Sequence, residues 1–177
     1  MGKLLVLVNG LPGAGKSTTG RALARTLDAR FLSKDTVKDA LANCVDDAAD
    51  LPELGGIAMD AIWALARATN SAVVVDSWWF APRDREHARR GIARAAADRT
   101  VEVWCDATEP VARARYASRH RPSYYGDAQR LVTHWDIWAR AAAPLGLTPV
   151  VTVDTTSPVD YVTLADRIEL AAVQGTR

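Results

Sequence analysis

The chain alternates between short apolar runs and longer segments in which apolar residues recur at helical spacing. The first run, from Leu4 to Val8, contains no polar residue. An uninterrupted run of this kind is typical of a strand that is buried on both faces of a parallel sheet. This run and four further short segments predict five strands, at residues 4–8, 30–33, 72–75, 101–105 and 150–153.

The segments between these runs predict helices. Ile62 and Leu65 mark the buried face of the third helix, and Pro82 opens the fourth, where its missing N–H costs nothing. Strands separated by helices indicate βαβ units, so the predicted fold is α/β, a five-stranded parallel sheet with helices on both faces. No repeat, linker or low-complexity tract interrupts the pattern, and one domain over residues 1–177 is expected. The third helix covers residues 58–69, the other predicted helices cover 16–27, 35–43, 108–119, 127–142 and 161–172, and an acidic loop covers 44–56.

The segment between the first strand and the first helix reads Gly-Leu-Pro-Gly-Ala-Gly-Lys-Ser over residues 10–17. This is the phosphate-binding loop of P-loop proteins, in which glycines let backbone N–H groups converge on a phosphate. Lys16 adds a charge for the β- and γ-phosphates, and the Ser17 hydroxyl can bind Mg²⁺. The alternative is a glycine-rich turn that matches by chance; a strand before it and a helix after it would exclude that. The predicted ATP-binding residues here are Gly10, Gly13, Ala14, Gly15, Lys16, Ser17 and Thr18.

The composition of the chain limits which ligands and which location are expected for the protein. The 22 basic and 21 acidic side chains leave a formal net charge of +1, so no overall field favours nucleic acid. A guanine-reading Asn/Thr-Lys-x-Asp motif is absent, which argues against GTP. Cys44 and Cys105 lack metal-ligand spacing and are expected to be reduced and partly buried. The apolar run at the N-terminus is too short for a signal peptide, so a cytoplasmic protein without a membrane span is expected. Oligomeric state cannot be inferred.

The segment from Phe31 to Lys38, Phe-Leu-Ser-Lys-Asp-Thr-Val-Lys, resembles the second-strand motif of small P-loop kinases. The group comprises chloramphenicol phosphotransferase, the zeta toxins and the kinase domain of polynucleotide kinase. The resemblance implies that Asp35 is the general base for the acceptor hydroxyl. A carboxylate at the C-terminal end of a parallel strand lies on the same sheet edge as the phosphate loop, and this position is consistent with the implied role of Asp35. Asp35 could instead cap its helix. Lys38, which stands where polynucleotide kinases have Arg, is a candidate for contact with the acceptor.

A second acidic residue, Asp76, ends the third strand and is followed by Ser-Trp-Trp-Phe. In the group that it resembles, this aspartate contacts the acceptor or, through water, the metal; a strand-end turn is the alternative. Trp78 and Trp79 are candidates for the acceptor pocket or for the core. Arg83 is a candidate for binding a charged group of the acceptor. It could instead belong to an exposed basic face of its helix. Trp63 and Trp104 are expected in the core.

The segment after the fourth strand resembles the lid of the same kinases, placed at about residues 115–127. Arg115 and Arg119 match its Arg-x-x-x-Arg pair, and residues four apart on a helix can converge on one anion. An exposed basic stripe is the alternative. Residues 121–126, rich in Pro, Ser and Gly, are expected to be a mobile, non-helical part of the lid. Thr156 lies in a loop that resembles the adenine-contacting loop.

Together these features predict an ATP- and Mg²⁺-dependent kinase that acts on a hydroxyl of a small molecule, an antibiotic-like or natural-product alcohol. A nucleoside, a sugar or a polynucleotide 5′-hydroxyl is the alternative acceptor. A nucleotide-binding switch without phosphotransfer is the alternative class. The sequence does not specify the acceptor, because no residue code determines the shape of a pocket.

Overall fold

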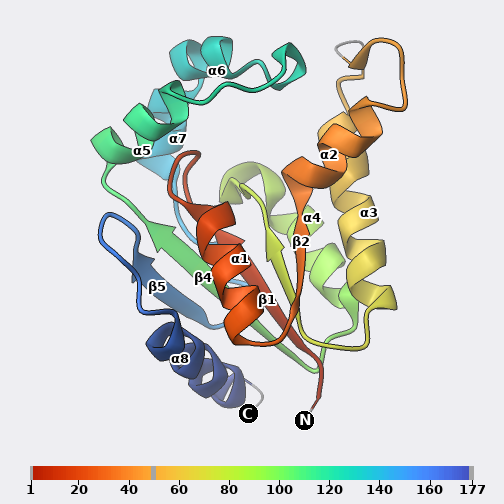
Figure 1. Ribbon diagram of the computed structural model, residues 1–177, viewed down its shortest axis with the longest axis vertical. Helices are drawn as coiled ribbons and strands as arrows, with labels where there is room; N and C mark the ends of the chain where they lie inside the picture. The colour runs from red at the N-terminus through yellow and green to blue at the C-terminus, as the bar shows by residue number, and fades with distance from the viewer. Residues whose placement is uncertain (1, 49–50, 176–177) are drawn as a thin grey trace.

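The structure is a computed structural model that describes residues 2–48 and 51–175. It contains a sheet in the order β2-β3-β1-β4-β5, and every neighbouring pair is parallel. This confirms the predicted five-stranded parallel α/β fold (Figure 1). The strands are β1 Leu4–Asn9, β2 Arg30–Ser33, β3 Val73–Asp76, β4 Arg99–Asp106 and β5 Val150–Asp154.

Helices cover both faces of the sheet because β1 is apolar on both sides. Leu4, Val6 and Val8 pack in a core with α1 and α8, whereas Leu5 and Leu7 pack in a second core with α3 and α4. Helices α5, α6 and α7 lie above the carboxyl ends of the strands (Figure 1). The helices are α1 Lys16–Thr26, α2 Lys34–Ala42, α3 Leu54–Ala68, α4 Ala81–Ala95, α5 Glu109–Ala117, α6 Asp127–Thr133, α7 Trp135–Ala141 and α8 Tyr161–Gln174.

Three details of the sequence prediction are wrong. Helix α3 begins at Leu54, inside the predicted loop, and Leu65 is 45% exposed because the buried stripe runs through Met59 and Trp63 instead. The predicted helix 127–142 is two helices that meet at His134, whose φ of −121° departs from helical geometry. This bend lets the ring of the following Trp135 stack on Tyr116.

The remaining core expectations are met in part. Trp63 is buried, Trp104 is half-buried, and Cys105 is buried while Cys44 is exposed. Cys44 differs from expectation because it lies two residues beyond the end of α2, at the surface. No helix within residues 2–48 and 51–175 is long and apolar enough to cross a membrane.

Candidate active site

The phosphate loop joins β1 to the N-terminus of α1, so the strand and helix that the motif requires are present. Its glycines have positive φ angles, 145° at Gly10, 87° at Gly13 and 80° at Gly15. Space is restricted as well, since a Cβ on Gly13 would lie 2.0 Å from the carbonyl oxygen of Ala112. The loop therefore combines left-handed backbone with close packing, which only glycine permits.

Lys16 is buried beneath this loop. Its ammonium donates hydrogen bonds to the carbonyl oxygens of Gly10 and Leu11, both at 2.8 Å. Burial, with a smaller contribution from Arg119, lowers the pKa of Lys16 to about 8. A desolvated ammonium gains stability when an anion approaches, so the loop is set up electrostatically for phosphate.

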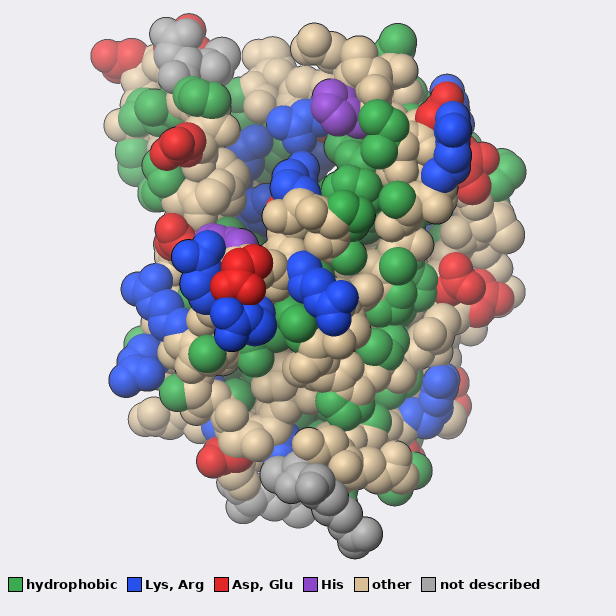
Figure 2. All heavy atoms as spheres, turned by 180° about the vertical axis from the view of Figure 1, so that it is seen from behind, with side chains coloured by type: hydrophobic (Ala, Val, Ile, Leu, Met, Phe, Trp, Pro, Cys, Tyr) green, Lys and Arg blue, Asp and Glu red, His purple; other side chains and the backbone are tan. Residues whose placement is uncertain are grey.

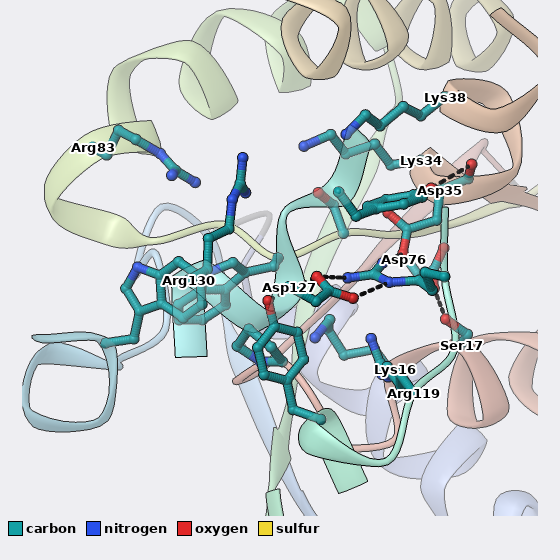
Figure 3. A pocket seen from close by; sticks show the side chains of 17 residues that line it. Lys16, Ser17, Lys34, Asp35, Lys38, Asp76, Arg83, Arg119, Asp127 and Arg130 are labelled. Carbon is teal, nitrogen blue, oxygen red and sulfur yellow. Dashed lines mark hydrogen bonds and ion pairs between the residues drawn. The ribbon is translucent and has the colours of Figure 1, made fainter. Parts of the chain in front are cut away.

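The ends of three neighbouring strands bring the acidic residues to this loop. Val8 of β1 is in register with Asp76 of β3, which is in register with Ser33 of β2. Residues that follow these positions therefore meet at one edge of the sheet. Asp35, two residues beyond Ser33, faces the same pocket as Asp76 (Figure 3).

Asp76 and Ser17 form the oxygen-rich part of the pocket. The Ser17 hydroxyl donates to Asp76 Oδ2 at 2.5 Å. Asp76 is 4% exposed, and burial raises its pKa, opposed by the Ser17 and Ser33 hydroxyls. Its second oxygen, Oδ1, is buried and accepts no hydrogen bond from the described part of the chain. A hydroxyl beside a carboxylate oxygen with a free lone pair fits Mg²⁺, which prefers oxygen ligands.

Asp35 does not cap α2. The helix begins at Lys34 with Ser33 as its N-cap residue, and the Ser33 side chain makes no capping hydrogen bond. Asp35 Oδ2 instead accepts a hydrogen bond from Arg121 Nη1 at 2.7 Å (Figure 3). The capping alternative is therefore wrong, because the residue lies inside the first turn and its carboxylate points into the pocket.

Arg121 was predicted as part of the lid but not as a site residue, and its hydrogen bond to Asp35 connects the lid to α2. Its Nε and Nη2 atoms donate to the two carboxylate oxygens of Asp127, both at 2.7 Å. The hydroxyls of Tyr124 and Tyr125 donate to Asp39 Oδ1, also at 2.7 Å. The segment 123–125 is a 3-10 helix with Tyr125 buried, so the prediction of a wholly non-helical segment is wrong. Its tyrosines bind α2 and order the turn.

The two predicted lid arginines share a hollow of about 410 Å³ beside the phosphate loop. Gly13, Gly15 and Thr18 form its floor. Arg115 is exposed and donates two hydrogen bonds of 3.2 Å to the Thr155 carbonyl oxygen, whereas Arg119 also lines the pocket with Asp35.

Thr156 is not among the residues that line this hollow. Its N–H and hydroxyl both donate to Asp154 Oδ1, at 2.8 and 2.6 Å. The neighbouring Thr155 and Ser157 line the hollow instead.

A larger pocket, of about 650 Å³, adjoins the pocket with Asp35. Trp78 lines both pockets, while Trp79 is 2% exposed, stacks on Trp63 and contributes only to the wall of the larger one. Predicted residues that line the pocket with Asp35 are Lys16, Ser17, Lys38, Asp76, Trp78, Arg83 and Arg119. Trp138, a ring that could contact the acceptor or belong to the core, lines it as well. Residues there that sequence reasoning missed are Pro12, Lys34, Ser77, Tyr116, Arg121, Tyr125, Asp127 and Arg130.

Several solved structures share this fold. A candidate kinase from Chloroflexus aurantiacus j-10-fl is 24% identical, with a TM-score of 0.75 over 98% of each chain. A gluconokinase from Sinorhizobium meliloti 1021 is 20% identical, with a TM-score of 0.56 over 97% of this chain and 90% of that one. Shikimate kinase from Acinetobacter baumannii, in complex with shikimate, is 15% identical, with a TM-score of 0.55 over 96% and 93%.

At these identities the likeness establishes the fold, which is that of P-loop kinases. No curated protein matches the sequence significantly. A family profile described as an AAA domain matches residues 5–143, which include the phosphate loop, Asp35, Asp76 and the lid. The chain therefore belongs to this AAA domain family.

Proposed function

We propose that the protein is an ATP- and Mg²⁺-dependent phosphotransferase that moves the γ-phosphoryl group of ATP to a hydroxyl of a small molecule. One observation carries this proposal: Lys16 and Ser17 of the phosphate loop line the same pocket as the Asp35 carboxylate. A phosphate-binding loop alone would suit a switch, whereas a carboxylate facing it supplies a base for an acceptor hydroxyl.

The phosphate loop and its surroundings bind the nucleotide in this proposal. Backbone N–H groups of the loop and Lys16 hold the β- and γ-phosphates, and Arg115 and Arg119 lie over the adjoining hollow. Ser17 and Asp76 would hold Mg²⁺, Asp76 either directly or through water. The ion, when bound, neutralises charge on the phosphates.

The chemical step requires a base and a cation near the transferring group. The acceptor oxygen forms a bond to the γ-phosphorus while the bond from that phosphorus to the β–γ bridging oxygen breaks, and ADP leaves. The acceptor proton passes to Asp35. Arg119, which reaches both the hollow and the pocket, stabilises the charge on the transferring group.

The larger pocket supplies the acceptor site in this proposal. Its volume of about 650 Å³ suits a small molecule. Leu54, Met59 and Trp78 provide apolar wall, which favours an antibiotic-like or natural-product alcohol. The names of structural neighbours support both classes of acceptor that the sequence left open, since they include a tunicamycin resistance protein and a gluconokinase.

A transfer screen tests the proposal. Purified protein is incubated with Mg²⁺, ATP labelled at the γ-phosphate and a panel of hydroxyl compounds, and labelled products are separated. Lys16→Met should abolish transfer, while Arg21→Gln, on the same helix but stacked on Phe31 at 4.9 Å, should retain it. Failure of wild-type protein to bind ATP–Mg²⁺, or equal transfer by both variants, would refute the assignment.

A further inference from the structure

The larger pocket has a strong positive charge for a chain whose net charge is only +1. Lys34 and Lys38 reach it from α2, Arg83 from α4 and Arg130 from α6. These four basic residues face one acidic residue in the lining, Asp84, which leaves a formal excess of +3. Figure 3 shows their nitrogen atoms directed toward a common space, and Figure 2 shows basic side chains gathered in a hollow of the surface.

Most of these cations are not neutralised by the protein. Among residues 2–48 and 51–175, no carboxylate lies within ion-pair distance of Lys34, Lys38 or Arg130, and only Arg83 is paired, with Asp84 at 2.7 Å. Lys38 lies over the ring of Tyr125 at 4.1 Å instead. The unpaired positive charges repel one another, and a bound anion would offset this repulsion.

Burial reinforces the need for an anion. It lowers the pKa of Lys34. The nearby carboxylates of Asp35 and Asp84 oppose this effect, and Arg83 and Arg130 add smaller lowering contributions. Burial also lowers the pKa of Lys38, with Arg130 and Lys34 next in size. The ammonium groups are therefore held close together at a cost that a bound anion would relieve.

The position of the cluster relative to Asp35 identifies what this anion belongs to. Lys34 precedes Asp35 in the chain, and Lys38 lies one helical turn further along α2. The same basic residues line both the pocket with Asp35 and the larger pocket. ATP has its own cations, Lys16 and Arg119, at the phosphate loop. A molecule whose hydroxyl lies at Asp35 therefore extends toward the basic cluster.

We propose that the acceptor carries an anionic group, a phosphate or a carboxylate, and that Lys34, Lys38 and Arg130 bind it while the hydroxyl lies at Asp35. This inference rests on the proposed kinase function. An excess of three positive charges suits a dianionic phosphate, and the apolar wall at Leu54 and Met59 suits a carbon skeleton beside it.

Calorimetric binding tests the inference without requiring turnover. The protein is saturated with Mg²⁺ and a non-hydrolysable ATP analogue, so that the phosphate loop is filled. Glycerol, glycerate, glycerol 3-phosphate and inorganic phosphate are then titrated separately. At least one anion should bind at least about tenfold more tightly than glycerol, since hydrogen bonds to charged groups are stronger than those between neutral groups. The ratio of glycerate to glycerol 3-phosphate distinguishes carboxylate from phosphate.

Substitutions locate the bound anion. Lys34→Met, Lys38→Met and the exposed Arg130→Gln should each weaken anion binding about tenfold. Arg89→Gln, on α4 but paired with Glu86 outside the pocket, should leave binding unchanged. Thermal melting checks that each variant is folded. If a lysine variant does not fold, the exposed Arg130→Gln variant provides the test.

The outcomes separate this inference from the kinase assignment. If the ATP analogue does not bind, the kinase assignment fails, and the titration is repeated on Lys16→Met, whose phosphate loop lacks its charge. Anion binding that depends on Lys34 and Lys38 still supports the basic site. Anions that bind no better than glycerol, or that bind equally to the Lys34 and Lys38 variants, overturn it even if a neutral alcohol is phosphorylated.

Discussion

Asp35→Asn is the substitution that tests the proposed mechanism most directly. Asparagine has nearly the same shape and can still accept a hydrogen bond from Arg121, but it cannot take a proton from a hydroxyl. The ion pair that is lost is partly in solvent, since the side chains of Asp35 and Arg121 are 49% and 21% exposed. Such pairs contribute about 1 kcal/mol or less to the free energy of unfolding, so the variant should fold normally.

The expected loss of rate is much larger than this loss of stability. General-base catalysis contributes about 10² to 10⁴ in rate. Even the lower limit corresponds to about 2.7 kcal/mol in the activation free energy. We therefore expect kcat to fall at least about 100-fold, with ATP affinity unchanged because the phosphate loop is intact.

Asp39→Asn is the matched control. Asp39 lies one turn further along α2 and accepts hydrogen bonds from the hydroxyls of Tyr124 and Tyr125, both at 2.7 Å, but it does not line the pocket. Asparagine keeps an acceptor for these hydroxyls. Urea unfolding gives stability, and release of ADP in the presence of an acceptor gives kcat. Near wild-type kcat for Asp35→Asn, or equal losses in both variants, would show that Asp35 is not the base.

Three further predictions concern the lid, the phosphate loop and the core. Arg119→Gln should lower kcat at least about tenfold with little change in ATP affinity, because a cation acts mainly on the transferring group; a loss below about threefold at both Arg119 and Arg115 would assign them to the solvated surface. ATP binding should raise the pKa of Lys16 from about 8, so the protein should take up protons on binding at pH 8 and none at pH 6; calorimetry in buffers of different ionisation enthalpy measures this, and equal uptake at both pH values would contradict it. Gly91→Ala should lower the free energy of unfolding by about 1–3 kcal/mol, because its Cβ would lie 2.0 Å from Trp63 Cε2. Gly56→Ala, whose Cβ meets nothing within 4 Å, is its control in urea unfolding, and equal losses would refute the packing argument.

The strands and the phosphate loop could be predicted because their signals are local. Strands buried on both faces leave continuous apolar runs, and a phosphate loop needs glycine and lysine at fixed spacing. The start of α3 could not be predicted in this way. Pro52 and Gly55 suggest a loop, yet Leu54 is buried, and this tertiary contact overrides the weak local propensity.

Most of the pocket could not be predicted because its contacts join distant parts of the chain. Arg121 and Asp35 are 86 positions apart, and nothing in the sequence separates Arg121 from the nearby Arg119, which matched a motif. The basic cluster could not be predicted for the same reason, because its residues come from distant parts of the chain. Lys34 and Arg130 are ordinary surface residues in the sequence, and they line one pocket only because the fold brings α2 and α6 to either side of it.

Asn9 shows how the fold links the two sides of the site. In the sequence it only ends an apolar run, but its Oδ1 accepts hydrogen bonds from the N–H groups of Gly10, at 2.8 Å, and Trp79, at 3.1 Å. Its Nδ2 donates to Glu102, a buried carboxylate that also accepts from the N–H of Leu145 at 2.9 Å. Buried, satisfied polar networks of this kind resist displacement. The first residue of the phosphate loop and the aromatic wall of the acceptor pocket are therefore held by one side chain, so the distance between the two proposed substrates is set by the core beneath them.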